Sequence, residues 1–315
     1  MPDPRIVIAL GGNALGDSPI EQQESIDKAA VSLIGLIAQG YEIIVTHGNG
    51  PQVGMIQQAF EISSKNNEGI PIVDLPECTA MSQGYIGFHL QKGLLRELHR
   101  QGMPWHVATV VTQIVVDEND PAFKNPTKPI GSFVSEKAAS RLMEENPQVM
   151  YKEDSGRGWR RMVASPKPIK IVEDDSILNL LDHEFIVIAC GGGGIPVVED
   201  ACGHYHSVPA VIDKDFSAAL LAQAIDATFF FILTAVDKVA INWGKSDQVD
   251  LDEMTVSQAE EYCRQGQFAA GSMLPKVEAA IHFVKSDPKR TAVIASLEKA
   301  PLAMKGQCGT RIIYG

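Results

Sequence analysis

Three stretches of the sequence combine glycines with the ends of apolar runs, a pattern suited to binding phosphate. They are residues 10–13 (LGGN), 46–51 (THGNGP) and 190–196 (CGGGGIP). In open α/β sheets ligands bind at the carboxyl ends of strands, and glycines there let backbone N–H groups approach phosphate oxygens closely. Each stretch alone is also typical of an ordinary tight turn. Three of them at equivalent positions predict a phosphate cradle.

Two common nucleotide-binding motifs do not occur in the sequence. There is no G-x-x-x-x-G-K-[ST], and none of the three glycine stretches fits G-x-G-x-x-G. The pattern therefore argues against a P-loop and against a Rossmann dinucleotide site.

Nearby lysines decide whether the predicted cradle can move a phosphoryl group, because that reaction needs positive charge and little covalent help. Lys214 lies between two aspartates in the stretch 211–215 (VIDKD), directly before a helical pattern at 216–224. We expect Asp213 to orient Lys214 while Lys214 bridges phosphates. The stretch is equally typical of a solvated charge cluster whose aspartates cap a helix.

Two further lysines have unusual neighbours. Lys276 follows a glycine turn and a proline that is predicted to begin a helix over 277–284, so this lysine lies in the first turn. A cation there is unfavourable against the helix dipole, which indicates a nearby anion. Lys128 stands between prolines in 124–129 (KNPTKP), where it either swings over a bound substrate or is simply solvated.

Other polar residues are weaker candidates. His204 and His206 form an H-x-H pair without a third ligand nearby, which favours a solvated loop over a metal site. His47 precedes the second glycine turn and is predicted to be a turn or core histidine with satisfied hydrogen bonds rather than a base. The arginines of 154–161 (DSGRGWRR) either bind an anion or belong to an ion-paired hairpin.

The elements that position these residues follow from the apolar pattern. Short runs without polar alternation are typical of strands covered on both faces, and they occupy 6–10, 43–46, 107–116, 185–190, 229–234 and 292–296. Helical patterns cover 22–39, where Ile26, Ala30, Leu33 and Ile37 share one face, and about 76–100. This alternation predicts a doubly wound α/β fold with helices on both faces of a mostly parallel sheet.

One segment breaks the alternation. Residues 117–168 mix six prolines with charged residues and contain a single clear helical pattern, 135–145. A connection this long inside a compact domain is usually functional. We expect a protruding subdomain or lid.

Composition narrows the class of protein. The chain has 315 residues, of which 45% are hydrophobic and 21% charged, so it is expected to fold into one or two compact units. A formal charge of -12 argues against nucleic acid and acidic membranes as partners. The five cysteines form no C-x-x-C pair, and the apolar runs are too short for a secretion signal or a membrane span. We expect a soluble protein with reduced thiols.

Taken in order, the motifs resemble the carbamate kinases, a branch of the amino acid kinase family. The motifs run from ALGGNA and THGNGPQVG through MSQGYIGF, FKNPTKPIG and EDSGRGWR to CGGGGIPVV, AVIDKD, ILTAVDKV, FAAGSMLPK and CGTRII, so the similarity covers essentially the whole chain. The resemblance implies a single amino acid kinase domain over 1–315, an open αβα sandwich with 117–168 as the protruding subdomain. It also implies a cytoplasmic homodimer that interconverts ATP plus carbamate with ADP plus carbamoyl phosphate, using Mg²⁺.

The resemblance further implies roles for individual residues. The substrate side is expected mainly in 1–215 and the nucleotide side mainly in 216–315. The lysines at Lys214 and Lys276 would neutralise phosphates, Asp213 would organise them, and Lys128 would close over the site. The transferred phosphoryl group and the small substrate would lie on Gly11, Gly12, Asn13, Gly48, Asn49 and Gly50, and the nucleotide on Thr234, Asp237, Met273 and Leu274. No protein side chain is expected to hold a metal directly. Many relatives carry a lysine where this chain has Leu10, and carbamate kinases share that difference.

The resemblance leaves two questions open. Carbamoyl phosphate is a mixed anhydride, so ATP synthesis during arginine or ureido catabolism is the expected direction. A paralogue acting on another small carboxylate or phosphate would retain the same motifs. A catalytically silent nucleotide-binding regulator is disfavoured, because such a protein would be free to lose Lys128, Asp213, Lys214 and Lys276.

Overall fold

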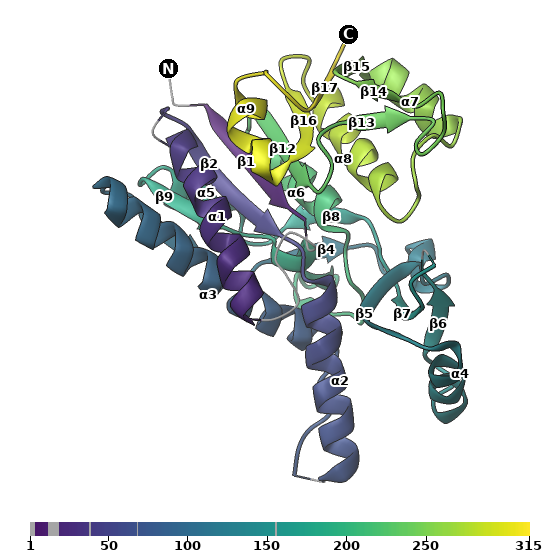
Figure 1. Cartoon of the computed structure of the whole chain (residues 1–315). Coiled ribbons are helices and arrows are strands. Elements are labelled where there is room, and N and C mark those ends of the chain that lie inside the picture. The colour runs from purple at the N-terminus through teal and green to yellow at the C-terminus, as the bar shows by residue number, and fades with distance from the viewer. Residues whose placement is uncertain (1–3, 12–18, 38, 68, 155) are drawn as a thin grey trace.

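An eight-stranded sheet forms the centre of the molecule (Figure 1). The structure is a computed structural model that describes residues 4–11, 19–37, 39–67, 69–154 and 156–315, so Gly12 and Asn13 of the first glycine turn lie outside the described residues. The strands, in their order across the sheet, are β15 (Glu253–Thr255), β17 (Thr310–Ile313), β16 (Thr291–Ser296), β12 (Phe229–Thr234), β1 (Arg5–Leu10), β2 (Glu42–His47), β9 (Phe185–Ile188) and β3 (His106–Thr109).

Burial on both faces explains why the central strands are apolar throughout. In β1 the side chains of Ile6, Ile8 and Leu10 enter one core, whereas those of Val7 and Ala9 enter the other. Six of the seven neighbouring pairs are parallel, and β16 with β17 is antiparallel. The predicted mostly parallel sheet is confirmed.

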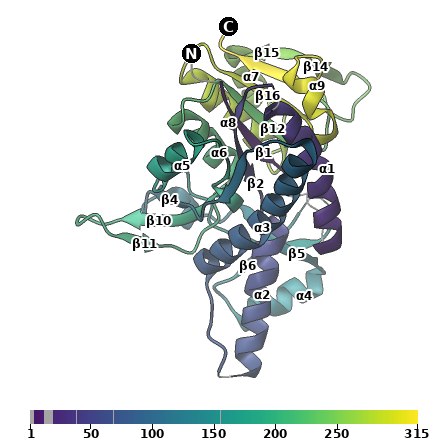
Figure 2. The same cartoon turned by 90° about the vertical axis from the view of Figure 1, so that its left-hand side faces the viewer.

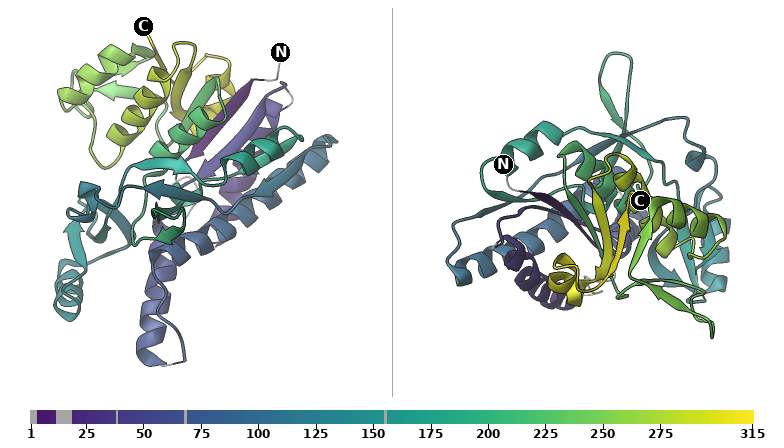
Figure 3. Two further views of the ribbon diagram at one scale, coloured as in Figure 1. Left: turned by 180° about the vertical axis from the view of Figure 1, so that it is seen from behind. Right: turned by 90° about the horizontal axis from the view of Figure 1, so that it is seen from above.

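Helices cover both faces of this sheet, which confirms the αβα sandwich (Figures 1 and 3). On one face, the predicted stripe Ile26, Ala30, Leu33 and Ile37 is buried against the strands. The helices of that face are α1 (Pro19–Ile37), α3 (Leu75–Gln101) and α9 (Ala300–Met304), which follows the short η4 (Leu297–Lys299). The other face carries α5 (Asp174–Leu181), α6 (Lys214–Ala224), α7 (Val256–Arg264) and α8 (Met273–Lys285).

The run 107–116 is two strands in two sheets, so its prediction as one covered strand is wrong. After β3, the chain leaves the main sheet through the half-exposed Val111 and enters β4 (Gln113–Val116). A continuous apolar run cannot show this change, because Val107 of β3 is buried like Ile114, Val115 and Val116 of β4. The second sheet has the order β11 (Tyr205–Ser207), β10 (Ile195–Glu199), β4 and β8 (Pro168–Ile171).

The hairpin of β10 and β11 projects from the body of the protein (Figure 2). His204 and His206 lie on it, exposed, and both contact the Asp200 carboxylate, with nitrogen-to-oxygen distances of 3.4 and 3.0 Å. Their side chains are therefore solvated, as predicted. A further hairpin, β13 (Val239–Ile241) with β14 (Val249–Leu251), lies beside α7.

A separate three-stranded sheet stands away from the main sheet, next to the projecting helix α2 (Gly50–Asn66) (Figure 1). A small core of Val53, Ile130, Val163 and neighbours joins it to α2 and α3. A Cβ atom placed on Gly54 of α2 would come within 2.1 Å of the Gly131 Cα, so this joint requires glycine. The elements are η2 (Pro121–Phe123), β5 (Lys128–Val134), α4 (Glu136–Glu145), β6 (Met150–Glu153) and β7 (Trp159–Val163), all inside the segment 117–168.

None of the described helices combines the length and apolarity needed to cross a membrane.

Candidate active site

A cleft of about 1580 Å³ opens where β1, β2 and β12 end, between the main sheet and the three-stranded sheet. Gly11, Gly48 and Gly50 line it from the strand ends, and Lys128 lines it from β5. The cleft is larger than the usual range for drug-sized ligands, about 300–1,000 Å³, so a nucleotide and a small acceptor both fit. The three predicted lysines, Lys128, Lys214 and Lys276, all line this cleft.

Lys214 and Lys276 meet on one carboxylate, that of Asp215. The Nζ atoms donate to the two Asp215 oxygens at 2.5 Å from Lys214 and 2.8 Å from Lys276. Lys214 and Asp215 begin α6, and Lys276 lies on α8, so the packing of these helices brings the three groups together. Asp213 was expected to orient Lys214, but the carboxylate that Lys214 contacts is that of Asp215.

Asp213 instead fixes Lys128 and the start of α6. One Asp213 oxygen accepts from the Asp215 backbone N–H at 2.9 Å as the helix cap, and the other accepts from Lys128 Nζ at 2.5 Å. Asp213 therefore caps α6, as the alternative interpretation of this stretch predicted. Lys128 belongs to β5, so this ion pair ties the three-stranded sheet to the floor of the cleft. Its role as a closing residue remains a prediction.

Burial and charge act in opposite directions on the lysine pair. Burial lowers the pKa of Lys214, and the positive charge of Lys276 adds to that effect. Burial would also lower the pKa of Lys276, but Asp215 outweighs it and the pKa is raised. Burial would raise the pKa of the Asp215 carboxyl, but the two lysines hold it well below its ordinary value. Asp215 therefore counteracts the effect of burial on the pKa of both lysines.

The glycine turns contribute less backbone N–H than expected. The amide of Gly11 donates to Leu233 O at 3.1 Å and that of Gly48 to Leu10 O at 3.2 Å, so both are used by the protein. Among the described residues, the start of α2 offers further donors, because the first N–H groups of a helix have no intrahelical acceptor. Asn49, the residue before the helix, does not cap them with its side chain, which donates to Ser82 Oγ at 2.8 Å instead. This uncapped end suits an anion.

The third glycine stretch packs behind the second. A Cβ atom on Gly191 would lie 2.4 Å from His47 Nε2, and one on Gly192 would lie 2.1 Å from Asn49 Nδ2. The glycines thus allow close approach of backbone to side chain, and Gly192 also lines the cleft. His47 is a core histidine, as predicted, but it is not fully satisfied, because its Nε2 has no hydrogen-bond partner among the described residues. Burial lowers its pKa to about 4, and the Lys214 charge adds to that effect. It is neutral at physiological pH.

The predicted nucleotide residues fall into two groups. Thr234 and Asp237 line the cleft, and Asp237 is ion-paired with Lys299. The side chains of Met273 and Leu274 pack against the core instead, because α8 begins at Met273 rather than after the proline. The cleft wall at this end consists of Ala270, Gly271, Ser272, Pro275 and Lys276.

Arginines from the β6–β7 hairpin also reach the cleft. Arg160 donates to Gly131 O at 2.9 Å and to Asp154 at 3.3 Å, and its guanidinium stacks over Phe133. Arg160 and Arg157 both line the cleft. The hairpin and the anion-binding interpretations of 154–161 are therefore compatible.

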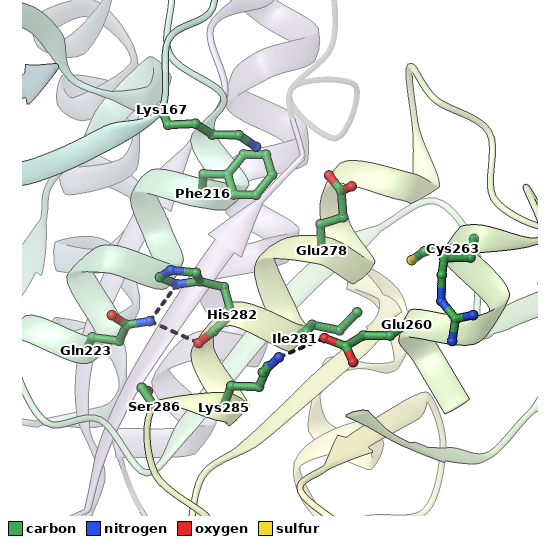
Figure 4. A pocket seen from close by; sticks show the side chains of 11 residues that line it. Lys167, Phe216, Gln223, Glu260, Cys263, Glu278, Ile281, His282, Lys285 and Ser286 are labelled. Carbon is green, nitrogen blue, oxygen red and sulfur yellow. Dashed lines mark hydrogen bonds and ion pairs between the residues drawn. The ribbon is translucent and has the colours of Figure 1, made fainter. Parts of the chain in front are cut away.

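A second pocket of about 900 Å³ runs along α8 between α6 and α7 (Figure 4). Two pairs of its polar groups bond each other, since Gln223 bonds His282 and Lys285 bonds Glu260. Lys167 and Phe216 line both this pocket and the cleft, and Lys167 Nζ lies 3.2 Å from the centre of the Phe216 ring. Lys167 thus stands at the edge of the cleft. The spacing of residues 165–169 (SPKPI) belongs to the family resemblance, but it indicated no role for Lys167.

Metal ligands on the protein are few. Among the described residues no group of three or more His, Cys, Asp or Glu side chains is arranged to hold a metal ion. Asp213 and Asp215, the carboxylates in the cleft floor, are both engaged by lysines.

Comparison with known proteins agrees with this geometry. Residues 4–296 match the model of the amino acid kinase family. The chain is 51% identical over 308 residues to the carbamate kinase-like protein YqeA of Escherichia coli (strain K12), covering 98% of each. It is 50% identical over 314 residues to the carbamate kinase of Clostridium perfringens (strain 13 / Type A), covering 98% of this chain and 99% of that protein.

A solved structure shows the same fold with a nucleotide analogue. The carbamate kinase from Giardia lamblia bound to AMP-PNP superposes with a TM-score of 0.89 and 40% identity, covering 99% of this chain and 98% of that one. The matches in sequence and in fold show that the chain belongs to the carbamate kinases of the amino acid kinase family.

Proposed function

We propose that this protein transfers a phosphoryl group reversibly between ATP and carbamate. In the forward direction the bond from the terminal phosphorus to the ADP oxygen breaks, and a bond from that phosphorus to a carbamate oxygen forms. The observation that carries the proposal is the pair Lys214 and Lys276, fixed on Asp215 in the same cleft as the uncapped start of α2. Relatives of about 50% identity that are carbamate kinases support it.

The residues suit a reaction that depends on positioning and charge. Lys214 and Lys276 neutralise the phosphate oxygens, and the α2 N–H groups hold the transferred group or the acceptor. Lys128 covers the acceptor from β5. Carbamate is already anionic at the attacking oxygen, so no general base is needed, which agrees with the neutral, buried His47.

The nucleotide is proposed to lie on the half of the cleft formed by residues 216–315. Thr234, Asp237 and the Gly271 turn line that half. Mg²⁺ would enter on the nucleotide phosphates and neutralise part of their charge. Gly12 and Asn13 are proposed to complete the acceptor side together with the start of α2.

The biological setting is proposed from the chemistry and the family. Carbamoyl phosphate is a mixed anhydride, so ATP formation in arginine or ureido catabolism is the favoured direction. A cytoplasmic homodimer is proposed on the family resemblance, and light scattering of the purified protein at micromolar concentration tests the dimer.

A substrate panel tests the reaction itself. Coupled ADP formation is compared with carbamate, acetate, glutamate and UMP as acceptors. We expect carbamate to be preferred by orders of magnitude in kcat/KM. The similarity to a protein named carbamate kinase-like makes a paralogue with another acceptor the second candidate, and preference for any other compound of the panel would support that candidate.

A further inference from the structure

Gln52 is a buried amide with no partner in the cleft wall. It is the third residue of α2, lines the cleft beside Gly50 and is 1% exposed. Neither its Nε2 nor its Oε1 has a hydrogen-bond partner on any residue that the structure describes. Burying an unsatisfied amide is costly, and native proteins satisfy nearly all such groups. Contacts within the described part of the protein therefore do not explain why an amide is buried at position 52.

The neighbouring amides show that this layer of the protein can satisfy such groups. Asn49 donates to Ser82, as described above. Gln83 donates to Gly191 O at 3.0 Å and accepts from the Thr112 N–H at 2.8 Å. Gln52 alone among these three amides keeps both a free donor and a free acceptor, and it does so in the wall of the substrate cleft. Its missing partner is expected to come from the cleft.

We propose that Gln52 recognises the amino group of the acceptor and so selects carbamate; this inference rests on the proposed function. Carbamate carries N–H donors next to carboxylate oxygens. The Gln52 Oε1 accepts from the carbamate N–H, and Nε2 donates to an oxygen, so both orphaned atoms are satisfied. Acetate has a methyl group in place of the amino group and leaves Oε1 buried and unpaired. Sites built to bond a substrate N–H discriminate strongly against analogues that lack it. Gln52 is a specificity-determining residue, and no bond is made or broken on it.

The test compares two acyl phosphates in the direction of ATP formation. Purified wild-type protein and Gln52→Met are supplied with ADP and either carbamoyl phosphate or acetyl phosphate. Methionine has similar volume but offers no amide. Gln57→Met is the matched control, because Gln57 is a buried residue of the same helix that does not line the cleft.

We expect Gln52→Met to lower kcat/KM for carbamoyl phosphate by about 10- to 100-fold, with the KM for ADP unchanged and acetyl phosphate affected by less than about two-fold. Its melting temperature should equal or exceed that of the wild type, since an unpaired amide is removed. The control should keep the wild-type preference. Equal losses on both acyl phosphates, or no loss, would overturn the proposal.

Two further outcomes are assigned in advance. If Gln52→Met does not fold, Gln52→Leu is measured in the same way, and failure of both variants to fold shows a structural role and overturns the proposal. If the wild type makes no ATP from carbamoyl phosphate, the proposed function itself fails. Wild-type activity with an unchanged preference in a folded Gln52 variant refutes only the role of Gln52.

Discussion

Replacing Asp215 with asparagine removes the carboxylate that Lys214 and Lys276 share. Both ammonium groups bind the same carboxylate, so their nitrogens lie within about 7 Å of each other, and at an effective dielectric constant of about 20 their repulsion amounts to about 2 kcal/mol. In the wild type the carboxylate offsets that repulsion. Asparagine keeps the shape and removes the charge, so the two buried cations face each other without compensation.

The expected result is a displaced pH profile. In the proposed mechanism Lys214 acts as a cation, so we expect the rate to fall as pH rises through the pKa of Lys214, which burial already lowers. Without Asp215 that pKa drops further. Since about 1.4 kcal/mol corresponds to one pKa unit, the alkaline limb of kcat/KM should move to lower pH by at least about one unit. Breaking a buried ion pair costs about 3–5 kcal/mol, so Asp215→Asn should also melt at a lower temperature, and excess ADP should restore part of the loss.

The assay is ATP formation from ADP and carbamoyl phosphate, measured across the pH range for Asp215→Asn and for Asp252→Asn. Asp252 pairs with Lys238, but its side chain is 83% exposed, and exposed ion pairs contribute little. The control should match the wild type. An Asp215→Asn profile that coincides with the wild-type profile would refute the argument that Asp215 keeps these lysines charged.

Three further predictions follow from the site and its supports. Lys276→Ala should lower kcat by about 100-fold or more with the fold intact, as judged by circular dichroism, and near-normal turnover would contradict its assigned role. Lys128→Ala should lose carbamate-dependent turnover while calorimetry shows ADP binding largely kept; abolished ADP binding would overturn the closing role. Gly54→Ala should lower the free energy of unfolding by about 1–3 kcal/mol, because its methyl group would meet the Gly131 backbone. Gly84→Ala, on a helix with open space around the new Cβ, should stabilise by about 0.4–1 kcal/mol in the same denaturant titration, and equal effects at the two glycines would contradict the packing argument.

The fold was largely predictable from the sequence because its strands are buried on both faces. The runs at 6–10 and 229–234 are continuous and apolar, and they pair in parallel at the centre of the sheet. The run 107–116 was predicted as one strand because its apolar residues are nearly continuous. The chain changes from one sheet to another near Val111, and the sequence does not show that change. The end of β9 was also less regular than predicted, since Cys190 adopts a left-handed conformation (φ 53°) before the glycines.

The site was predictable in its residue types but not in its pairings. Lys128, Lys214 and Lys276 line one cleft, as the motifs indicated. Sequence adjacency placed Lys214 equally near Asp213 and Asp215, and only the crossing of α6 and α8 decides between them. The hydrogen bonds of the glycine turns could not be predicted either. The amides of Gly11 and Gly48 donate to backbone carbonyls of neighbouring strands, and the carbonyl that each one meets depends on the register of those strands.

The most direct test of the central claim is ATP formation from ADP and carbamoyl phosphate by the purified protein, compared with its Lys214→Ala variant. We expect ATP to form with the wild type and the rate to fall by about 100-fold or more in the variant, because Lys214 is proposed to neutralise the moving phosphate. No ATP from the wild type, or equal rates from both proteins, would contradict the account.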